Sequence, residues 1–369
     1  MKVVIAIDSF KGSLSSMQAG NAVKAALLGL DADIQVVVKP LADGGEGTVD
    51  ALSEGGKLIE TTVHGPLMQP LQAKYCILKD TAVIEMAAAA GITLVSERNP
   101  LETTTYGVGE LILDAIHRGC RRFIVGIGGS ATNDGGTGML TALGYEFLDK
   151  TGNPIALGAK GLKDLCSIKT DKVLPQLQEC SFRIACDVNN PLCGERGCSA
   201  VYGPQKGATP EMVKDMDGWL SGFASLAGGR YKDYPGAGAA GGLGFGFLTF
   251  TNATLQPGID IVLEETGLEQ ELRDADVVVT GEGRLDGQTV MGKAPIGVAK
   301  LAKKYGKPVI AFSGCVTEEA VVCNDHGIDA YFPILRQITT LEQALDVEAA
   351  TKNLQATATQ VFRLMHIFK

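Results

Sequence analysis

Short apolar runs rich in β-branched residues recur along this chain of 369 residues, and polar, glycine-containing loops and helical patterns separate them. Residues 3–7 and 34–39 predict two buried strands, and the segment between them predicts a helix. Ser13 or Ser15 can cap the start of that helix. Further strands are predicted at residues 276–280, 308–312 and 330–334, and further helices at 295–305 and 341–364. Because strands that alternate with helices form parallel sheets covered on both faces, a parallel α/β sheet is predicted.

The middle of the chain shows a different pattern, typical of antiparallel strands. Strands joined by short turns are predicted at residues 57–64, 73–78 and 81–86, and a hairpin is predicted at residues 145–155. We therefore expect two domains. Residues 1–55 and 266–369 would form the parallel-sheet domain, and residues 56–265 would form a mixed α/β domain inserted into it.

The overall charge and the cysteine pattern exclude several classes of protein. A net charge of −9 disfavours a nucleic-acid partner, because an acidic surface repels phosphodiester backbones. No uncharged apolar stretch is long enough to span a membrane, and the acid at Asp8 does not fit the layout of a signal peptide. The nine cysteines contain no Cys-x-x-Cys pair, which is typical of reduced thiols, so we expect a cytoplasmic protein.

Open parallel sheets bind their ligands in the loops at the carboxyl ends of the strands. The loop after the first predicted strand places Ser9 and Lys11 at the start of a helix, where free N–H groups suit a phosphate or a carboxylate. The alternative is a capped helix with a solvated lysine. The loop after the second strand contains Asp43 and Gly44, which could bring an acid and a close main chain to Mg²⁺ or a hydroxyl group. The alternative there is a plain Asp-Gly turn.

The loop richest in glycine follows a strand predicted at residues 123–127. It offers many backbone N–H donors and hydroxyl groups, as the phosphates of a nucleotide require. It is not a Rossmann Gly-x-Gly-x-x-Gly fingerprint, because Ala131 stands where the third glycine is needed. The candidate binding residues in this loop are Gly128, Gly129, Ser130, Asn133 and Asp134.

A carboxylate and two amides follow the strand predicted at residues 182–186. Asp187 and Asn189 at this strand end can bind substrate hydroxyl groups or Mg²⁺. The alternative is an Asx-turn, which the following Asn-Pro pair also favours.

The loop predicted after residues 276–280 combines two acids with two cations. Residues 287–293 spell Gly-x-x-x-x-Gly-Lys, but Ala294 replaces the Ser or Thr of a P-loop, so we reject a Walker A motif. The segment stays a candidate site without a Walker A motif, because its glycines and charged residues precede a predicted helix that has a proline near its start. The candidate residues of this segment are Glu282, Arg284, Asp286 and Lys293.

Together these loops supply what phosphoryl transfer needs. That reaction requires donors and a metal to spread negative charge, a carboxylate to accept the proton of an alcohol, and positioning. The four histidines lie outside the loops, which disfavours a hydrolase or dehydrogenase that depends on histidine. An oxidoreductase that uses NAD is further disfavoured by the missing dinucleotide fingerprint.

Four motifs together resemble the class I bacterial glycerate kinases, in order and along nearly the whole chain. They are Asp-Ser-Phe-Lys-Gly-Ser at 8–13, Leu-Ala-Asp-Gly-Gly-Glu-Gly-Thr at 41–48, Gly-Ile-Gly-Gly-Ser-Ala-Thr-Asn-Asp-Gly-Gly at 126–136, and Thr-Gly-Glu-Gly-Arg-Leu-Asp at 280–286. The resemblance implies a flavodoxin- or Rossmann-like parallel-sheet domain interrupted by an inserted mixed α/β domain, with the site between them. It also implies ATP, Mg²⁺ and D-glycerate, with 2-phospho-D-glycerate as the usual product.

On this basis we assign roles to the candidate residues as a hypothesis. Asp187 or Asp286 accepts the proton of the glycerate hydroxyl group, and the other helps to place Mg²⁺, with Asp43 as a further metal ligand. Lys11, with Arg284 and Lys293, binds the substrate carboxylate and the transferred phosphate. The expected catalytic residues are Asp187, Asp286 and Lys11, and the expected binding residues are Ser9, Asp43, Gly44, Gly128, Gly129, Ser130, Asn133, Asp134, Asn189, Glu282, Arg284 and Lys293.

Two alternatives to a glycerate kinase stay open at this point. The first is a kinase of another small hydroxy acid, which would use the same phosphate chemistry. The second is a non-catalytic protein that binds sugar acids, although it would not need two candidate acids together with three cations. The expected partners are small molecules, without nucleic acid or membrane, and the sequence leaves a homo-oligomer open.

Overall fold

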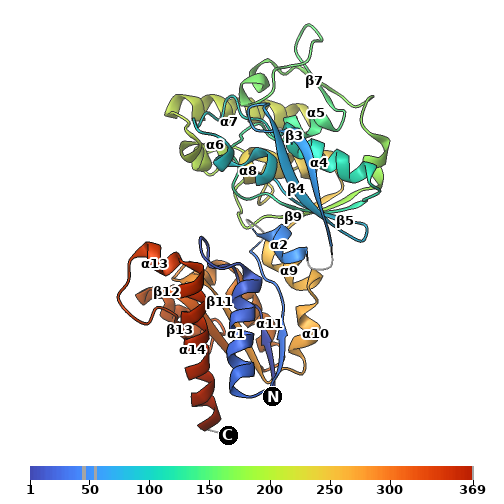
Figure 1. Ribbon diagram of the computed structural model, residues 1–369. Coiled ribbons are helices and arrows are strands. Elements are labelled where there is room, and N and C mark those ends of the chain that lie inside the picture. Colours follow the sequence, from blue (N-terminus) through green and yellow to red (C-terminus); the bar gives the residue numbers. More distant parts are fainter. Residues whose placement is uncertain (44–46, 54–55, 368–369) are drawn as a thin grey trace. The chain divides into compact units, whose positions relative to one another are not determined.

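The computed structural model describes residues 1–43, 47–53 and 56–367, and the chain forms two compact units (Figure 1). Met1–Asp43 and Ile259–Lys369 make up the first unit, and Gly44–Gly258 make up the second. Each unit has its own main sheet and its own apolar core. The predicted α/β class with mostly parallel strands is confirmed.

The first unit is built on a five-stranded sheet in which all neighbouring strands are parallel. The strand order is β13-β12-β11-β1-β2. Val3 of β1 pairs with Val36 on one side and with Val277 on the other. Because the pairing is parallel, all five strands end at the same edge of the sheet. The strands are β1 (Lys2–Ile5), β2 (Gln35–Val38), β11 (Val277–Leu285), β12 (Val309–Val316) and β13 (Ala330–Pro333).

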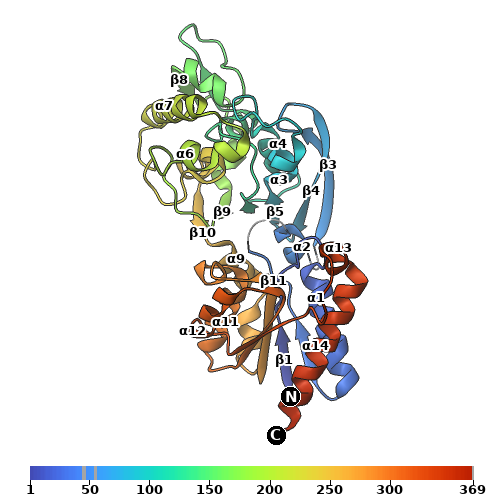
Figure 2. The ribbon, with the colours of Figure 1, turned by 90° about the vertical axis from the view of Figure 1, so that its left-hand side faces the viewer.

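Helices cover both faces of this sheet, as Figure 2 shows for α1 and α14 on one face and α11 and α12 on the other. Leu27 of α1 and Phe362 of α14 are fully buried against the sheet residues Ile5 and Val279. These apolar contacts hold the helical layer of α1 and α14 against one face of the sheet. The helices of this unit are α1 (Ser16–Leu30), α9 (Gly258–Glu265), α10 (Leu268–Leu272), α11 (Ala294–Lys303), α12 (Val322–Asp325), α13 (Leu341–Leu345) and α14 (Val347–Ile367).

Local sequence signals explain where these helices begin. The Ser15 hydroxyl group accepts a hydrogen bond from the N–H of Gln18, and the Gln18 side chain accepts one from the N–H of Ser15. This capping box confirms Ser15 as the start of the first helix. The single helix predicted at residues 341–364 is wrong, because Asp346 is extended between α13 and α14. Its carboxylate accepts a hydrogen bond from the N–H of Ala349, so it caps a new helix instead of continuing the old one.

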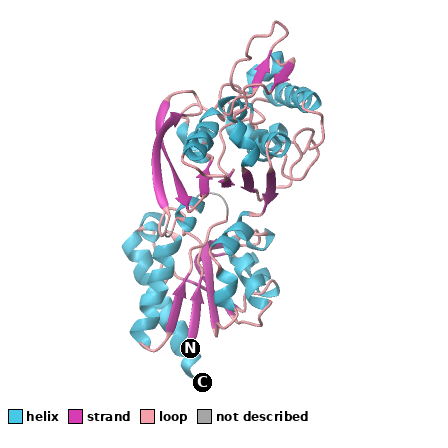
Figure 3. Cartoon of the chain, turned by 90° about the vertical axis from the view of Figure 1, so that its right-hand side faces the viewer, coloured by secondary structure: helices cyan, strands magenta, loops and turns pink. Residues whose placement is uncertain are grey.

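The second unit contains a six-stranded mixed sheet with the order β10-β9-β6-β5-β4-β3 (Figure 3). The pairs β3–β4 and β4–β5 are antiparallel, as predicted, and β5, β6, β9 and β10 run parallel. The Phe123 and Phe182 rings stack between β6 and β9 with their centroids 4.7 Å apart. The strands are β3 (Lys57–His64), β4 (Pro70–Leu78), β5 (Thr81–Glu85), β6 (Arg122–Gly126), β9 (Ser181–Ala185) and β10 (Ala253–Gln256).

Helices pack against this second sheet and bury a large apolar core. No helix in the described part of the chain combines the length and apolarity needed to cross a membrane. The helices of the second unit are α2 (Thr48–Leu52), α3 (Ala87–Ala90), α4 (Tyr106–His117), α5 (Thr137–Ala142), α6 (Cys198–Tyr202), α7 (Pro210–Leu226) and α8 (Ala239–Phe250).

The hairpin predicted at residues 145–155 forms only in part. The turn is present, because the N–H of Asp149 donates to the carbonyl oxygen of Asn153, and Leu148 makes an isolated bridge with Pro154. The N–H of Ile155 donates to the carbonyl oxygen of Phe147 at 3.0 Å, but Pro154 has no N–H to donate, so the pairing stays short. Strand β7 (Glu146–Leu148) pairs instead with β8 (Ser167–Lys169) in a separate two-stranded sheet.

The packing of α4 on β3 leads to a first prediction. A Cβ atom added to Gly107 of α4 would lie 1.9 Å from the carbonyl oxygen of His64 on β3. Gly107→Ala is therefore expected to lower the free energy of unfolding by about 1–3 kcal/mol, because the helix must move away from the strand. A Cβ atom added to Gly218, on the exposed face of α7, would meet no atom within 4 Å. Gly218→Ala should raise stability by up to about 1 kcal/mol. Urea unfolding measures the free energy of unfolding of both variants. Equal changes in the two variants would contradict this packing of α4 on β3.

Candidate active site

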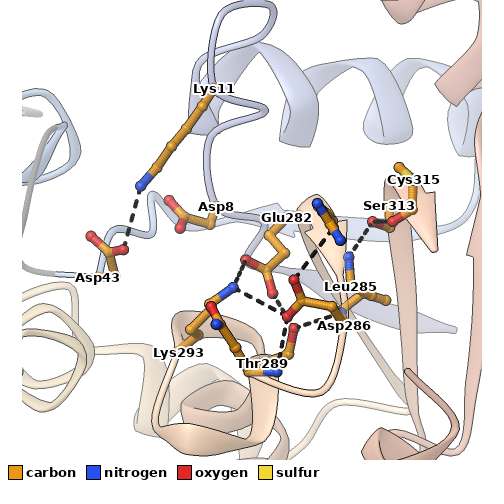
Figure 4. A network of polar contacts seen from close by, with 12 residues as sticks. Asp8, Lys11, Asp43, Glu282, Leu285, Asp286, Thr289, Lys293, Ser313 and Cys315 are labelled. Atoms are coloured by element: carbon orange, nitrogen blue, oxygen red, sulfur yellow. Dashed lines mark hydrogen bonds and ion pairs between the residues drawn. The ribbon is translucent and has the colours of Figure 1, made fainter. Parts of the chain in front are cut away.

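The carboxyl edge of the first unit's sheet carries a set of charged side chains that we call the charged cluster (Figure 4). Four carboxylates come from the ends of three neighbouring strands, β2, β1 and β11, and three cations lie among them. The charged cluster consists of Asp8, Lys11, Asp43, Glu282, Arg284, Asp286 and Lys293.

Strand β11 carries two side chains of the cluster along its own length. The sequence predicted that this strand ends at residue 280 and that a loop follows, which is wrong, because β11 stays paired with β12 up to residue 285. Glycine at position 281 permits this pairing, because the Cβ atom of any other residue would clash with the carbonyl oxygen of Phe312, 1.9 Å away. Glu282 and Arg284 are two residues apart on a strand, so they project from the same face.

Glu282 is nearly buried and is held by two neighbours. The Thr289 hydroxyl group donates to Glu282 Oε1 at 2.7 Å, and Lys293 Nζ lies 3.7 Å from Glu282 Oε2. Burial raises the pKa of Glu282, while the hydrogen bond from Thr289 and the charge of Lys293 act in the opposite direction. The carboxylate of Glu282 is therefore fixed in orientation.

Asp286 lies just beyond β11 and has two cationic neighbours. Arg284 Nε lies 3.3 Å from Asp286 Oδ2, and Lys293 Nζ lies 3.6 Å from Asp286 Oδ1. The N–H of Gln288 donates to Asp286 Oδ1 at 2.9 Å, which makes an Asx-turn. The Asp286 side chain is 18 % exposed, so a hydroxyl group of a ligand can reach it.

The Gly-x-x-x-x-Gly-Lys run that ends at Lys293 is not a phosphate loop, which confirms the rejection of a Walker A motif. It contains one turn of 3-10 helix at Thr289–Met291, and Lys293 is extended at the N-cap of α11. The amine of Lys293 lies between two carboxylates. The first N–H groups of α11 have no partner within the helix, so they favour negative charge near this end.

Asp8 belongs to this cluster, although the sequence reasoning did not select it. It follows the interior strand β1, is only 5 % exposed, and accepts a hydrogen bond from the N–H of Ser9 at 2.7 Å. Burial and the negative charges of Asp43 and Glu282 raise the pKa of Asp8 to about 7, against the opposing effects of Ser9 and Lys11. A carboxyl group with such a pKa suits proton transfer. The sequence signal was an acid directly after a fully buried strand.

Lys11 and Asp43 form the outer side of the cluster. Lys11 Nζ lies 3.7 Å from Asp43 Oδ2, and the Lys11 side chain is 64 % exposed, so the amine is available to a ligand. Gly12 has a φ of +80°, which only glycine adopts without strain, and it turns the chain after Lys11. Gly283 lies close to this loop, since an added Cβ atom would be 3.4 Å from the main-chain nitrogen of Lys11, in ordinary van der Waals contact.

The second unit brings predicted residues together at the carboxyl edge of its own sheet. Gly126 at the end of β6 pairs with Ala185 at the end of β9, so the loops that follow start side by side. Gly128 and Gly129 are exposed in the first loop, and Asp187 is exposed in the second. The N–H of Gly258, after β10, donates to Asp187 Oδ1 at 2.9 Å. Asn189 is exposed in the same loop as Asp187.

Behind the exposed glycines the same loop turns inward and is held by buried groups. Asn133 is fully buried, and its Nδ2 donates to Ser199 Oγ at 2.9 Å. Lys206 Nζ donates to Ser130 Oγ at 2.7 Å and to the carbonyl oxygen of Thr132 at 2.6 Å. The sequence reasoning missed Lys206. Lysines are almost always exposed, so no sequence signal marked this one as buried.

Asp134 is a second fully buried acid, and its hydrogen bonds all go to the protein itself. Its Oδ2 accepts hydrogen bonds from the N–H and the hydroxyl group of Thr105, and its Oδ1 accepts one from the N–H of Gly136. Burial raises the pKa of Asp134, and these donors act in the opposite direction. The side chain ties the segment before α4 to the start of α5, which gives it a supporting position behind the loop.

The structure thus gathers the candidate residues into two groups, one in each unit. In the part of the chain that the structure describes, no three His, Cys, Asp or Glu side chains form a complete metal site. Gly44 lies outside the described residues. The first group holds Ser9 and the charged cluster, and the second holds Gly128, Gly129, Ser130, Asp187 and Asn189, with Asn133 and Asp134 buried behind them.

Comparison with known proteins identifies the family. The model of the glycerate kinase family matches residues 3–366. The chain belongs to the glycerate kinase family. A glycerate kinase of Haemophilus influenzae is 50% identical over 99% of each chain, and the glycerate 2-kinase of Escherichia coli K12 is 45% identical over 97% of this chain and 98% of that one. A crystal structure named glycerate kinase 2, from Salmonella typhimurium LT2, covers 100% of this chain and 98% of that chain with a TM-score of 0.92 and 45% identity.

Membership of the glycerate kinase family makes this chain a transferase of the kinase class, which implies ATP as a substrate. It also confirms the resemblance that the four sequence motifs indicated. The two groups of polar residues are therefore read as parts of a kinase, whose chemistry needs anion binding and a proton acceptor.

The buried Asp8 predicts how stability of this glycerate kinase family member depends on pH. Its pKa in the folded state, about 7, lies above the ordinary value of 3.8. Proton binding by the folded state therefore contributes stability that is complete below an unfolded-state pKa of about 4 and is lost as the pH rises through about 7. Asp8→Asn stays neutral, so its melting temperature should exceed that of the wild type by a margin that grows from about pH 4 to about pH 7 and is constant above that.

Calorimetry at several pH values measures this margin. Asp215→Asn, on the exposed face of α7, is the control and should show no such growth. A margin for Asp8→Asn that is independent of pH would contradict the raised pKa.

Proposed function

We propose that this chain transfers the γ-phosphoryl group of ATP to D-glycerate and forms 2-phospho-D-glycerate. The observation that carries the proposal is the position of Asp286, a reachable carboxylate with Arg284 at 3.3 Å and Lys293 at 3.6 Å. A proton acceptor beside two cations is what the transfer of a phosphoryl group to an alcohol requires. The name of the Escherichia coli relative, glycerate 2-kinase, supports the position of the new phosphate.

The proposed reaction exchanges one phosphorus–oxygen bond for another. The bond from the γ-phosphorus to ADP breaks, the bond to the oxygen on carbon 2 of glycerate forms, and the hydroxyl proton passes to a carboxylate. Asp286 or Asp187 is the proposed acceptor of that proton. Lys11, Arg284 and Lys293 are proposed to bind the glycerate carboxylate and the phosphoryl oxygens, because their positive charge offsets the negative charge there.

The carboxylates also fit a magnesium ion. Mg²⁺ prefers oxygen ligands and is commonly bound by one or two carboxylates, with phosphate oxygens and waters as its other ligands. Asp43, Asp187 and Asp286 supply such oxygens, and their side chains are all at least partly accessible. We propose that Mg²⁺ is held by members of this set, where it would neutralise charge on the phosphates of ATP.

The second unit supplies a different kind of group. Gly128, Gly129 and Ser130 present main-chain N–H groups and a hydroxyl group beside the exposed carboxylate of Asp187. N–H donors in a row bind anionic oxygens, and a carboxylate binds hydroxyl groups or a cation. We assign this loop to one of the two anionic substrates.

Phosphorus NMR tests the proposed reaction and its product directly. The protein is incubated with ATP, Mg²⁺ and D-glycerate, and the new phosphate ester is observed with proton coupling. A phosphate on carbon 2 couples to a single methine proton and gives a doublet, whereas a phosphate on carbon 3 couples to a methylene group and gives a triplet. A doublet is expected. Absence of a new ester with glycerate, together with turnover of another hydroxy acid, would transfer the proposal to that substrate.

Substitution of the two candidate acids tests their roles. Asp286→Asn and Asp187→Asn keep the shape of the side chain but cannot accept the proton, so loss of the base is expected to lower kcat by roughly 10²–10⁴-fold. If one of the two residues binds Mg²⁺ instead, the kcat of its variant should be partly restored by a higher concentration of Mg²⁺. Steady-state kinetics with varied Mg²⁺ separate the two, and Asp215→Asn is the control. If a variant keeps nearly wild-type kcat, its residue is neither the proton acceptor nor the Mg²⁺ ligand.

The cysteines support a cytoplasmic location. All nine lie in the described part of the chain, and none is in a disulfide. Free thiols in this number are typical of a reducing compartment. We infer that the protein is cytoplasmic.

A further inference from the structure

The exposed turn at Gly128–Ser130 has main-chain donors that the protein does not use. Of the residues that the structure describes, none accepts a hydrogen bond from the N–H groups of Gly128, Gly129 or Ser130. Gly129 has a φ of +71°, so the backbone turns sharply at this point. Successive N–H groups around such a turn form a concavity that binds anions.

The buried side of this turn contains an ammonium group. Lys206 is 2 % exposed, and its Nζ donates to Ser130 Oγ at 2.7 Å and to the carbonyl oxygen of Thr132 at 2.6 Å. Both partners are neutral, and among the described residues no carboxylate forms an ion pair with Lys206. A buried charge without an ion-pair partner is costly, so its presence directly behind an anion-binding turn calls for a function.

The hydrogen bond between Lys206 and Ser130 determines what the Ser130 hydroxyl group can do. An ammonium group can only donate, so Ser130 Oγ is the acceptor in this bond. The hydroxyl proton of Ser130 is then left to donate to something else. Ser130 is 9 % exposed and lies next to the exposed glycines, so a ligand at the turn is its available acceptor.

We propose that Lys206 is the positioning residue of an anion site at Gly128–Ser130, where it fixes the Ser130 hydroxyl group to donate to an anionic oxygen of a substrate. The anionic oxygen belongs to a phosphate of ATP or to the carboxylate of glycerate. This inference deepens the proposed function, on which it rests for the identity of the two substrates. The ammonium group adds positive charge behind the site without touching the ligand.

Purely structural support of the loop does not account for Lys206. Other contacts already hold the loop, since Asn133 Nδ2 donates to Ser199 Oγ at 2.9 Å and the N–H of Gly135 donates to the carbonyl oxygen of Gly241 at 2.9 Å. A neutral donor would satisfy Ser130 equally well at a lower desolvation cost. The negative charge of Asp134 favours the ammonium form of Lys206, but the Asp134 oxygens accept hydrogen bonds from Thr105 and Gly136 instead of pairing with the amine. A bound anion at the turn would supply further opposing charge.

The first experiment compares binding of two anions, D-glycerate and a non-hydrolysable ATP analogue with Mg²⁺, by isothermal titration. Lys206→Met and Ser130→Ala are each expected to weaken the binding of one of them by about tenfold or more, because a hydrogen bond to a charged group is lost. The ligand whose binding is weakened is the one whose anionic oxygen binds at the turn. Because Lys206 acts through Ser130, the double variant should bind that ligand no more weakly than the single variants do.

Lys232→Met is the matched control. Lys232 Nζ donates to Ser221 Oγ at 3.1 Å, so this variant removes another lysine–serine hydrogen bond from the same unit. It should bind both ligands as the wild type does. If Lys206→Met does not fold, Ser130→Ala carries the test, since it removes only one hydroxyl group. The proposal is overturned if Lys206→Met and Ser130→Ala both bind both ligands with wild-type affinity. It is also overturned if the losses of binding free energy in the two single variants simply add in the double variant.

The pH dependence of binding gives an independent measurement. Burial lowers the pKa of Lys206 to about 8, and the charged or titratable groups that face it are Asp134, from the loop, and Cys198, from α6. Burial raises the pKa of Cys198 to about 11, so this thiol stays neutral as Lys206 titrates. Affinity of the wild type for the affected ligand should fall as the pH rises through about 8, and Lys206→Met should not show this fall. The same fall in Lys206→Met overturns the assignment.

The titration experiment remains informative if the proposed function fails. A missing phosphate ester in the NMR experiment contradicts the reaction, whereas loss of anion binding in the variants still supports the site. Conversely, a wild-type enzyme that makes 2-phosphoglycerate, with variants that bind both anions normally, overturns the role of Lys206 alone.

Discussion

The parallel pairing of β1 with β11 is the interaction on which the first unit depends. It joins the start of the chain, at Val3, to a segment about three quarters of the way along it, at Val277, and so brings Asp8 and Glu282 to one edge of the sheet. Burial at this edge raises the pKa of Asp8, and the negative charges of Asp43 and Glu282 add to the effect. Lys293, from the segment that leads into α11, supplies the opposing positive charge. The electrostatics of the cluster are therefore a consequence of strand order.

The second unit follows the same rule with different chemistry. Strands β6 and β9 are parallel neighbours, so the glycine turn after β6 and the carboxylate of Asp187 after β9 begin at one edge. Here main-chain N–H groups replace side-chain cations at the surface, and the positive charge of Lys206 lies behind them. A main-chain site holds its donors in fixed positions, whereas lysines such as Lys11 must be ordered by the ligand. On the proposed assignment, the edge of the second unit would bind an anion with preorganised donors, and the edge of the first unit would bind one with adaptable side chains.

The sequence predicted most strands of both sheets, because buried β-branched runs and acid–glycine loops are local signals. It placed Glu282 and Arg284 in a loop, since glycine usually ends a strand, and only the close pairing with β12 explains why β11 continues. Lys206 was not predictable, because its burial depends on a contact with Ser130 that is distant in sequence. Asp8 could have been selected, because it directly follows a fully buried strand. The burial of Lys206 and the length of β11 therefore depend on tertiary contacts, whereas Asp8 had a local signal that was not used.

Asp8 and Lys206 are buried ionisable groups of opposite sign, and burial shifts the pKa of each toward neutrality. Neither stabilises the fold in its charged form, since desolvation costs more than the few partners return. An apolar core would not select such residues. Asp8 accepts a hydrogen bond from the N–H of Ser9, and Lys206 donates to Ser130, and both serines lie in loops that follow the carboxyl ends of β1 and β6. Shifted pKa values of this kind are common at sites that bind anions and transfer protons, which is consistent with the proposed roles of both edges. The desolvation cost at these two positions is what the proposed chemistry would account for.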